Sequence, residues 1–196
     1  MARFTFGAAL LCALAFGPAG SLAHPALVAV NGPVATTQRD GQHDFDFLLG
    51  SWKSHYKVLR HPLSGSHDWY EFDGTNVVRP LLHDQGNIEE GYLYRPAGRI
   101  DALTLRMYNP ATHDWSLYWA TVKSGLSIPP QVGRFNAAGV GDFYDNETYA
   151  GKPIVVRYHW THTGRTVWHF EQSFSADGRK TWETNWISDS VARTSG

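Results

Sequence analysis

Alternation of apolar and polar residues, and not helical spacing, dominates the chain after residue 50. A period of two is typical of strands whose two faces meet different surroundings. Turn dipeptides such as Arg95-Pro96, Asn109-Pro110 and Asp177-Gly178 interrupt the alternation at short intervals. The pattern therefore predicts strands at 51–60, 67–79, 86–94, 100–109, 114–123, 131–136, 139–147, 153–162, 165–174 and 181–190.

The links between these strands are too short to hold crossover helices, so each strand must pair antiparallel with its neighbour in sequence. The fold class that follows is all-β. We expect an antiparallel up-and-down meander of about eight to ten strands, because strands of this number can curl and close, which removes exposed edges and leaves room for one small ligand. A two-sheet sandwich with Greek-key returns is the alternative, but it needs long connections that the sequence lacks.

The first apolar run carries the signal for one end of the barrel. The stretch Asp44–Leu49 resembles a short helical turn, and Gly50 can adopt the positive φ that ends it. Trp52 is then the first side chain of the first strand that points inward. We expect its large ring to fill that end of the barrel.

This Gly-x-Trp arrangement resembles the start of the first strand in the lipocalin/calycin superfamily. Over residues 43–188 the chain is also similar to the DUF1579-like family of bacterial calycin-like proteins. The similarity is carried by His43-Asp-Phe-Asp-Phe-Leu-Leu-Gly-Ser-Trp52, Trp69-Tyr-Glu-Phe-Asp-Gly74, Trp115-Ser-Leu-Tyr-Trp-Ala120, Glu171-Gln-Ser-Phe-Ser-Ala-Asp-Gly178 and Thr181-Trp-Glu-Thr-Asn-Trp186. The resemblance implies a calycin-like barrel and no particular chemistry. One departure is the basic residue that packs over the Trp in lipocalins, for which Arg193 is the only late candidate.

The N-terminal segment has the organisation of a secretory signal peptide at residues 1–23. Arg3 precedes a short apolar run, and small residues including Ser21 and Ala23 precede the predicted cleavage before His24. Residues 24–42 show no periodicity and predict a flexible leader, and residues 43–192 then form one barrel domain. We therefore expect a periplasmic or secreted protein.

Composition limits the classes of partner that the protein can have. The apolar run of the signal segment is too short for a membrane span, and no longer run follows. The only cysteine, Cys12, lies in the segment to be removed, so we expect neither a disulfide nor a lipid anchor. Loss of Arg3 makes the net charge of −1 one unit more negative, and no basic stripe indicates nucleic acid. The sequence leaves the oligomeric state open.

Charged and phenolic residues among aromatic ones are the candidates for a ligand pocket. A selective cavity needs a few polar groups within apolar walls, and buried ions must be paired by each other or by a ligand. The alternative is an internal Arg/Glu pair or outward display. The residues predicted to bind a ligand are Trp69, Glu71, Arg106, Tyr118 and Arg157. With a two-residue hairpin turn at Thr163-Gly164, Arg157 and His159 would face Phe170 and Trp168.

Metal and cofactor chemistry has little support in the sequence. His159 and His162 form an H-x-x-H, but residues three apart on a strand point to opposite faces. A haem barrel could use one lone histidine, and nothing selects one of the ten. We expect no metal site and no cofactor. The run Ser175–Trp182 resembles an Asp-box hairpin, in which the aspartate bonds backbone N–H groups and the tryptophan anchors the loop.

Three functions remain open. The leading one is binding of a small, partly apolar molecule in the barrel cavity. The second is an enzyme, a hydrolase, hydratase or isomerase, in the same cavity, although no nucleophile motif or phosphate loop marks one. It requires a carboxylate and a basic or phenolic partner within hydrogen-bond reach inside an open cavity. The third is a structural or interaction module, which requires a filled interior and an exposed apolar patch.

Overall fold

The computed structural model describes residues 39–193, so the predicted signal peptide and most of the predicted leader lie outside the described residues. The described chain begins with one turn of 3-10 helix and continues in eleven strands. These are η1 (Asp46–Leu48), β1 (Gly50–Leu59), β2 (Trp69–Leu81), β3 (Gly86–Arg95), β4 (Gly98–Asn109), β5 (Asp114–Thr121), β6 (Gly125–Leu126), β7 (Gln131–Phe135), β8 (Gly141–Tyr149), β9 (Lys152–Thr163), β10 (Val167–Ser175) and β11 (Glu183–Ala192).

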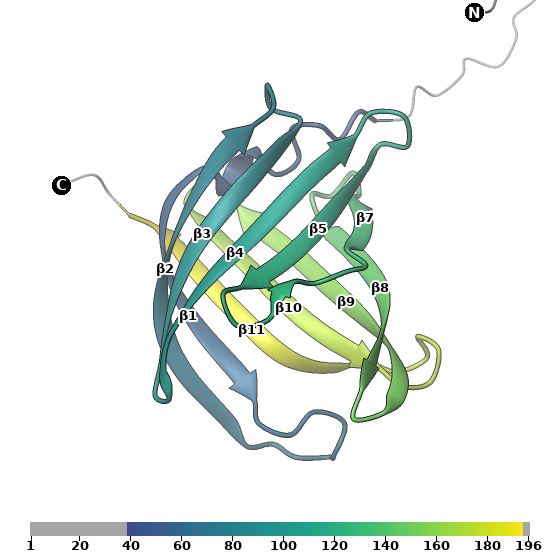
Figure 1. Cartoon of the computed structure of the whole chain (residues 1–196). Coiled ribbons are helices and arrows are strands. Elements are labelled where there is room, and N and C mark those ends of the chain that lie inside the picture. The colour runs from purple at the N-terminus through teal and green to yellow at the C-terminus, as the bar shows by residue number, and fades with distance from the viewer. Residues whose placement is uncertain (1–38, 194–196) are drawn as a thin grey trace, which may run out of the picture. The chain divides into compact units, whose positions relative to one another are not determined.

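Ten of the strands close into one antiparallel barrel (Figure 1). Each pairs with its neighbour along the chain, β4 pairs with β5, and β1 joins β11 to complete the circle. The two-residue β6 lies beside β5 and leaves the circle to β7. The predicted meander is therefore confirmed, and the sandwich is excluded because β1 is bonded on both sides.

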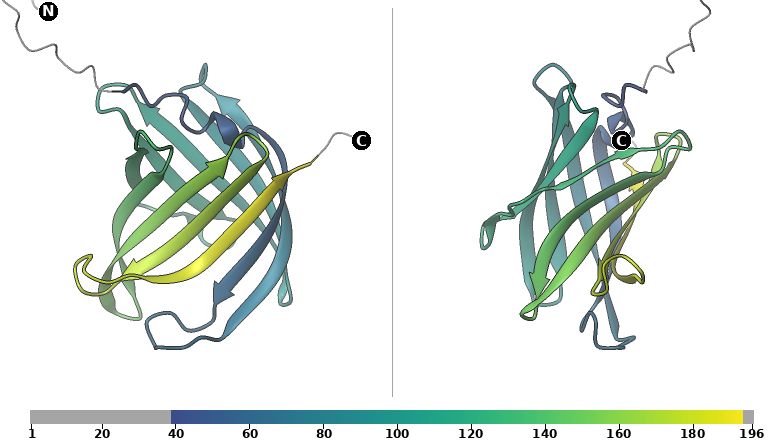
Figure 2. Two further views of the ribbon diagram at one scale, coloured as in Figure 1. Left: turned by 180° about the vertical axis from the view of Figure 1, so that it is seen from behind. Right: turned by 90° about the vertical axis from the view of Figure 1, so that its right-hand side faces the viewer.

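Alternation along the strands sorts side chains between the barrel interior and its outer face. On β1, Trp52, Ser54 and Tyr56 are buried while Lys53 is exposed. The same alternation on β8 buries Phe143 and Asp145. Figure 2 shows the strands tilted across the barrel, with the η1 turn at one end, close to the hairpin that joins β9 to β10. No helix among residues 39–193 has the length and hydrophobicity needed to cross a lipid bilayer.

Candidate ligand-binding site

One end of the barrel is closed by the η1 turn and the first strand. Phe45, Phe47 and Leu48 are buried there, and Phe45 packs edge-on against Trp115 with ring centroids 5.1 Å apart. Gly50 takes a φ of +126°, as expected, and the chain then enters β1. Trp52 is 1% exposed and donates its indole N–H to the carbonyl of Leu48 at 2.6 Å. The prediction that Trp52 fills this end of the barrel is confirmed.

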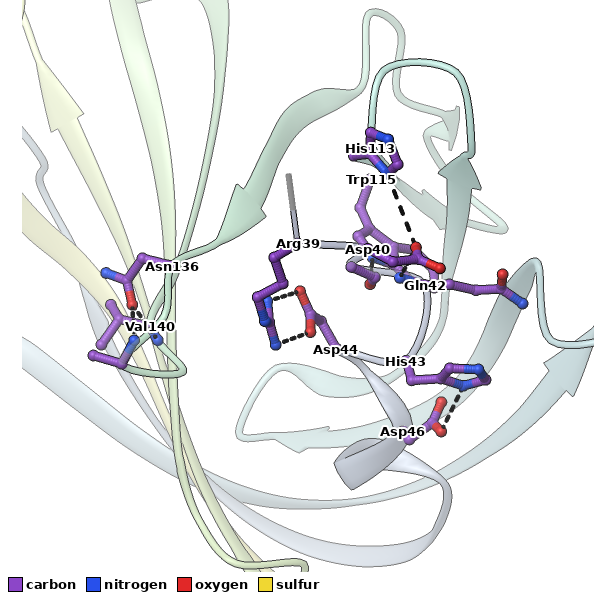
Figure 3. Close-up of polar contacts among 12 residues, drawn as sticks. Arg39, Asp40, Gln42, His43, Asp44, Asp46, His113, Trp115, Asn136 and Val140 are labelled. Carbon is purple, nitrogen blue, oxygen red and sulfur yellow. Dashed lines mark hydrogen bonds and ion pairs between the residues drawn. The ribbon is translucent and has the colours of Figure 1, made fainter. Parts of the chain in front are cut away.

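The residues before the turn are also bonded to this end (Figure 3). The indole N–H of Trp115 donates to the carbonyl of Gly41 at 2.9 Å, and the hydroxyl of Tyr108 donates to Asp40 at 2.6 Å. Arg39 forms an ion pair with Asp44. The contacts of the barrel therefore begin at residue 39, four residues before the domain start predicted at 43.

We call the residues that close this end, Phe45, Phe47, Leu48 and Trp52, the plug. A cavity of about 240 Å³ occupies the barrel beyond the plug. Its walls come from β1 to β5 on one side and from β9 to β11 on the other. Five aromatic rings of the second side line it: Tyr158, Trp160, Trp168, Phe170 and Trp186. The volume lies just below the roughly 300–1,000 Å³ of typical small-molecule pockets, so a compact occupant fits.

The first side carries most of a continuous hydrogen-bond network, which reaches β11 through Ser190. We call it the interior network, and its members are Ser54, Asn76, Asn87, Glu89, Arg106 and Ser190. Arg106 is 1% exposed, pairs with Glu89 and donates to the side-chain oxygen of Asn87 at 3.0 Å. Asn76 donates to the other oxygen of Glu89. Charge-assisted bonds therefore join the two buried ions, and each neutralises the other at this depth.

The guanidinium of Arg106 also lies against aromatic faces. Its central carbon is 5.2 Å from the ring centre of Trp160 and 5.3 Å from that of Phe45. Cation–π contacts of this kind gain strength where water is excluded. Arg106 thus joins the interior network to the aromatic wall and to the plug.

Several hydrogen-bond donors around the cavity have no acceptor. The indole N–H groups of Trp160 and Trp168 and the Nε–H of Arg106 are buried without a partner in the described part of the chain. Buried donors are nearly always paired, by protein or by water.

The structure does not bring the five predicted ligand-binding residues together. Arg106 lines the cavity, whereas Trp69, Glu71, Tyr118 and Arg157 are not among the lining residues. Glu71 bonds to Lys57 and His55 on the outer face of the barrel. Trp69 is partly buried at the last pair of β1 and β2, next to the loop between them.

Alternation explains the two remaining positions. Leu117 and Trp119 on β5 line the cavity, so Tyr118 between them points outward. Tyr158 and Trp160 on β9 also line the cavity, so the side chain of Arg157, which alternates with them, points outward.

The prediction of a two-residue turn between β9 and β10 is wrong. Thr163 pairs with Val167, so three residues form the loop and the register shifts. Arg157 therefore lies opposite Ser173, and His159 lies opposite Glu171. A longer loop that contains Gly164 at a φ of +61° can accommodate the strand twist equally well, which the sequence alone did not reveal.

The loop from Ser175 to Trp182 has the predicted Asp-box character. Asp177 accepts hydrogen bonds from the backbone N–H groups of Lys180 and Thr181, each at 3.0 Å. Side-chain and backbone bonds from Thr181 hold the pKa of Asp177 far below its usual value. The ring of Trp182 lies over the guanidinium of Arg157 at 4.8 Å. Asp177 therefore holds the loop together, and Trp182 anchors it to the barrel wall through Arg157.

Histidines gather on the outer face and not in the cavity. His55 bonds to Asp73 at 2.8 Å and to Glu71 at 3.1 Å. His169 bonds to Asp189 at 2.7 Å and to Glu171 at 3.1 Å. We call these two groups the outer His–carboxylate triads.

Both ring nitrogens of each imidazole face carboxylates, an arrangement that favours the doubly protonated ring. The hydrogen bonds that the His55 ring donates to Asp73 and Glu71 raise the pKa of His55. Burial opposes the charge of His169, but Asp189 and Glu171 outweigh it and raise its pKa as well.

The H-x-x-H does not converge on one point. His159 bonds to Asp142 at 2.8 Å, whereas His162 stacks on Phe47 with ring centroids 4.1 Å apart. No group of three or more His, Cys, Asp or Glu within residues 39–193 has the geometry to hold a metal ion.

Sequence reasoning missed the acidic partner inside the barrel. Glu89 and Glu90 are consecutive on β3, and only Glu89 is buried. The available signal was the alternation Asn87, Glu89, Gly91 and Leu93, which places Glu89 on the face of a buried leucine. It also missed Asp145, which alternates with the buried Phe143 in the same way.

Comparisons with known proteins support the fold. No family model matches the chain, and no curated protein matches it. Among solved structures, an S-type phycobiliprotein lyase, CPES, from Guillardia theta aligns with a TM-score of 0.53 at 11% identity, over 81% of this chain and 96% of that chain. Rv2717c from M. tuberculosis aligns with a TM-score of 0.53 at 12% identity, over 80% of this chain and 99% of that one. These likenesses support the closed antiparallel β-barrel, and at these identities they show the fold alone.

Proposed function

We propose that this protein is an exported barrel that binds a small, flat, partly apolar molecule in its interior. The observation that carries the proposal is the cavity of about 240 Å³ between the aromatic wall and the interior network. Flat rings stack favourably on indole and phenyl faces. Export rests on the sequence of residues 1–23.

The two alternative functions fit the interior less well. A purely structural module requires a filled barrel, and the cavity argues against it. An enzyme requires a free acid or base, and Glu89 with Arg106 does provide a carboxylate beside a basic group. Both oxygens of Glu89 are already bonded, however, one to Arg106 and one to Asn76. The Glu89–Arg106 pair is therefore better suited to stabilising the barrel wall than to transferring a proton.

Gly91 offers a direct test, because it lines the cavity and has room for a side chain. A Cβ added there would first meet Leu93 at 3.7 Å, an ordinary van der Waals distance. Gly91→Leu should fill the cavity while the barrel stays folded. The matched control is Tyr92→Leu, on the outer face of the same strand.

The experiment is native mass spectrometry of the chain purified from its own host, followed by identification of any small molecule that is released. We expect a retained compound on the wild type and on Tyr92→Leu, and none on Gly91→Leu. A compound retained equally by Gly91→Leu would place binding outside the cavity. An empty wild type, with no thermal shift across a panel of small aromatic molecules, would falsify the proposal.

A further inference from the structure

The cavity lining contains one pair of opposite charges. Of the lining residues that the described chain provides, only Glu89 on β3 and Arg106 on β4 are charged. Their side chains are 10% and 1% exposed, and they form an ion pair with each other. Arg106 also donates to Asn87, and Glu89 accepts from Asn76. The two charges therefore cancel each other, and the lining as a whole is neutral.

The other polar groups of the lining carry no charge at neutral pH. Besides the indole rings, they are Tyr56, Asn76, Thr104, Tyr158, Gln172 and Ser188. Groups of this kind offer hydrogen bonds but no counter-charge. An ion that enters the cavity loses its hydration and meets only charges that are already paired, which is unfavourable. An uncharged polar group needs no counter-charge, so the lining favours a neutral ligand.

The shape of the cavity favours a flat ring. Gly91 on β3 and Ala102 on β4 are ladder partners, and both line the cavity. Large rings, including Trp168 and Phe170, line it from β10. Small side chains on one side and aromatic faces on the other leave a space in which a planar ring can stack. The neutral lining and the flat space together favour an aromatic molecule without charge.

We propose that the cavity takes an uncharged aromatic molecule and that Glu89 and Arg106 determine this selectivity. The inference rests on the proposed function, because it names the class of molecule that the same cavity binds. Neither ion needs to touch the ligand. Each cancels the field of the other, and charges act over several ångströms where water is excluded. Loss of either ion would therefore leave a charge that attracts a ligand of the opposite sign.

Two carboxylates on β8 influence one lining residue without lining the cavity themselves. Burial first, and then the charges of Glu147 and Asp145, raise the pKa of Tyr158. Burial, followed by the charge of Glu147, raises the pKa of Asp145 to about 7. Measurements at pH 6 keep most of Asp145 protonated and so reduce this negative background.

The test compares three ligands that share an indole ring and differ in their head group. At pH 6 tryptophol is neutral, tryptamine is a cation and indole-3-acetate is an anion. Isothermal titration calorimetry of the wild type measures each affinity. We expect tryptophol to bind at least about tenfold more tightly than either ion, because each ion would be desolvated without a counter-charge.

Glu89→Gln separates the charge of the lining from its shape. The substitution leaves the charge of Arg106 uncompensated beside the cavity. Indole-3-acetate should then gain at least about tenfold in affinity relative to tryptophol, and tryptamine should bind more weakly. Glu90→Gln is the matched control, because Glu90 is the next residue of β3 and pairs with Arg79 on the outer face. This control should keep the ranking of the wild type.

A double variant covers the case in which Glu89→Gln does not fold. Glu89→Gln with Arg106→Met leaves no isolated ion in the lining and should again prefer tryptophol to both charged ligands. If the double variant bound indole-3-acetate more tightly than tryptophol, something other than Arg106 would attract the anion, and the assignment to this pair would be wrong.

The outcomes distinguish the two proposals. A wild type that binds tryptamine or indole-3-acetate as tightly as tryptophol would overturn the inference and leave the binding function standing. A folded Glu89→Gln variant with the ranking of the wild type would overturn the role of the pair. If none of the three ligands binds, the compound identified by native mass spectrometry decides. A charged compound would overturn the inference, an uncharged aromatic one would support it, and an empty cavity would remove the binding function itself.

Discussion

The interior network and the outer His–carboxylate triads are built from neighbouring residues of the same strands. Ser54 of the network and His55 of a triad are consecutive on β1, and Asp189 and Ser190 are consecutive on β11. Both groups place a cation beside carboxylate oxygens. Arg106 is 1% exposed, however, whereas the side chain of His55 is 43% exposed.

The difference shows that position, and not the number of charged contacts, decides what an ion pair contributes. Water screens the outer triads and competes for their hydrogen bonds, so their effect on stability is small. Inside the barrel the charges have lost their hydration, and each depends on the other. A change to one partner should therefore cost much inside and little outside.

The largest effect is expected from Arg106→Met. The substitution leaves Glu89 buried without its counter-charge, which costs about 3–5 kcal/mol in similar cases. Urea denaturation followed by tryptophan fluorescence measures the loss. The double variant Glu89→Leu with Arg106→Met should recover part of it, because no isolated ion remains. A single-variant loss below about 1 kcal/mol would show that the interior pair behaves like a surface pair.

A smaller loss is expected from Asn76→Ala. The side-chain oxygen of Asn76 accepts from Ser54 at 3.2 Å and from Tyr56 at 3.0 Å, and its amide donates to Glu89. Its removal leaves buried groups unsatisfied, at about 1–3 kcal/mol. Asn146→Ala, at an exposed position of β8, is the control and should stay close to the wild type in the same urea titration. Equal losses in the two variants would contradict the importance of burial.

The fold was predictable because most strands follow the local alternation and most of the links between them are short. Gly50 and Trp52 took their predicted roles for the same reason. The site was not predictable to the same extent, because alternation does not say which of two polar faces is the inner one. Arg106 shares its face of β4 with the buried Tyr108, and the structure places Arg106 inside the barrel.

Glu71 and Arg157 show why the remaining site residues failed to converge. Aromatic residues cover both sides of the wall, so an aromatic neighbour does not mark the interior. Trp182 packs over Arg157 from outside, while Tyr158 lines the cavity from inside. The choice depends on strand pairing across the whole barrel, which is non-local information.

The outer triads should make stability depend weakly on pH. His55 and His169 have raised pKa values in the folded state, so their contribution is complete below the unfolded pKa of about 6.5 and is lost as the pH rises through the folded values. We expect the melting temperature of the double variant His55→Gln with His169→Gln to fall below that of the wild type at pH 5.5 and to approach it at pH 8.5. The difference between the two proteins separates the histidines from other titrating groups. A difference that grows with pH would contradict the assignment.

The smallest effect is expected where an ion pair has neither burial nor a second partner. Arg79 and Glu90 pair on the outer face, with side chains 56% and 51% exposed. Arg79→Ala should change the free energy of unfolding by no more than about 1 kcal/mol, and added salt should weaken even this. Glu90 is the sequence neighbour of Glu89, so the two carboxylates test the comparison one residue apart. If Arg79→Ala and Arg106→Met lowered stability equally, burial would not be the property that separates the two faces of the wall.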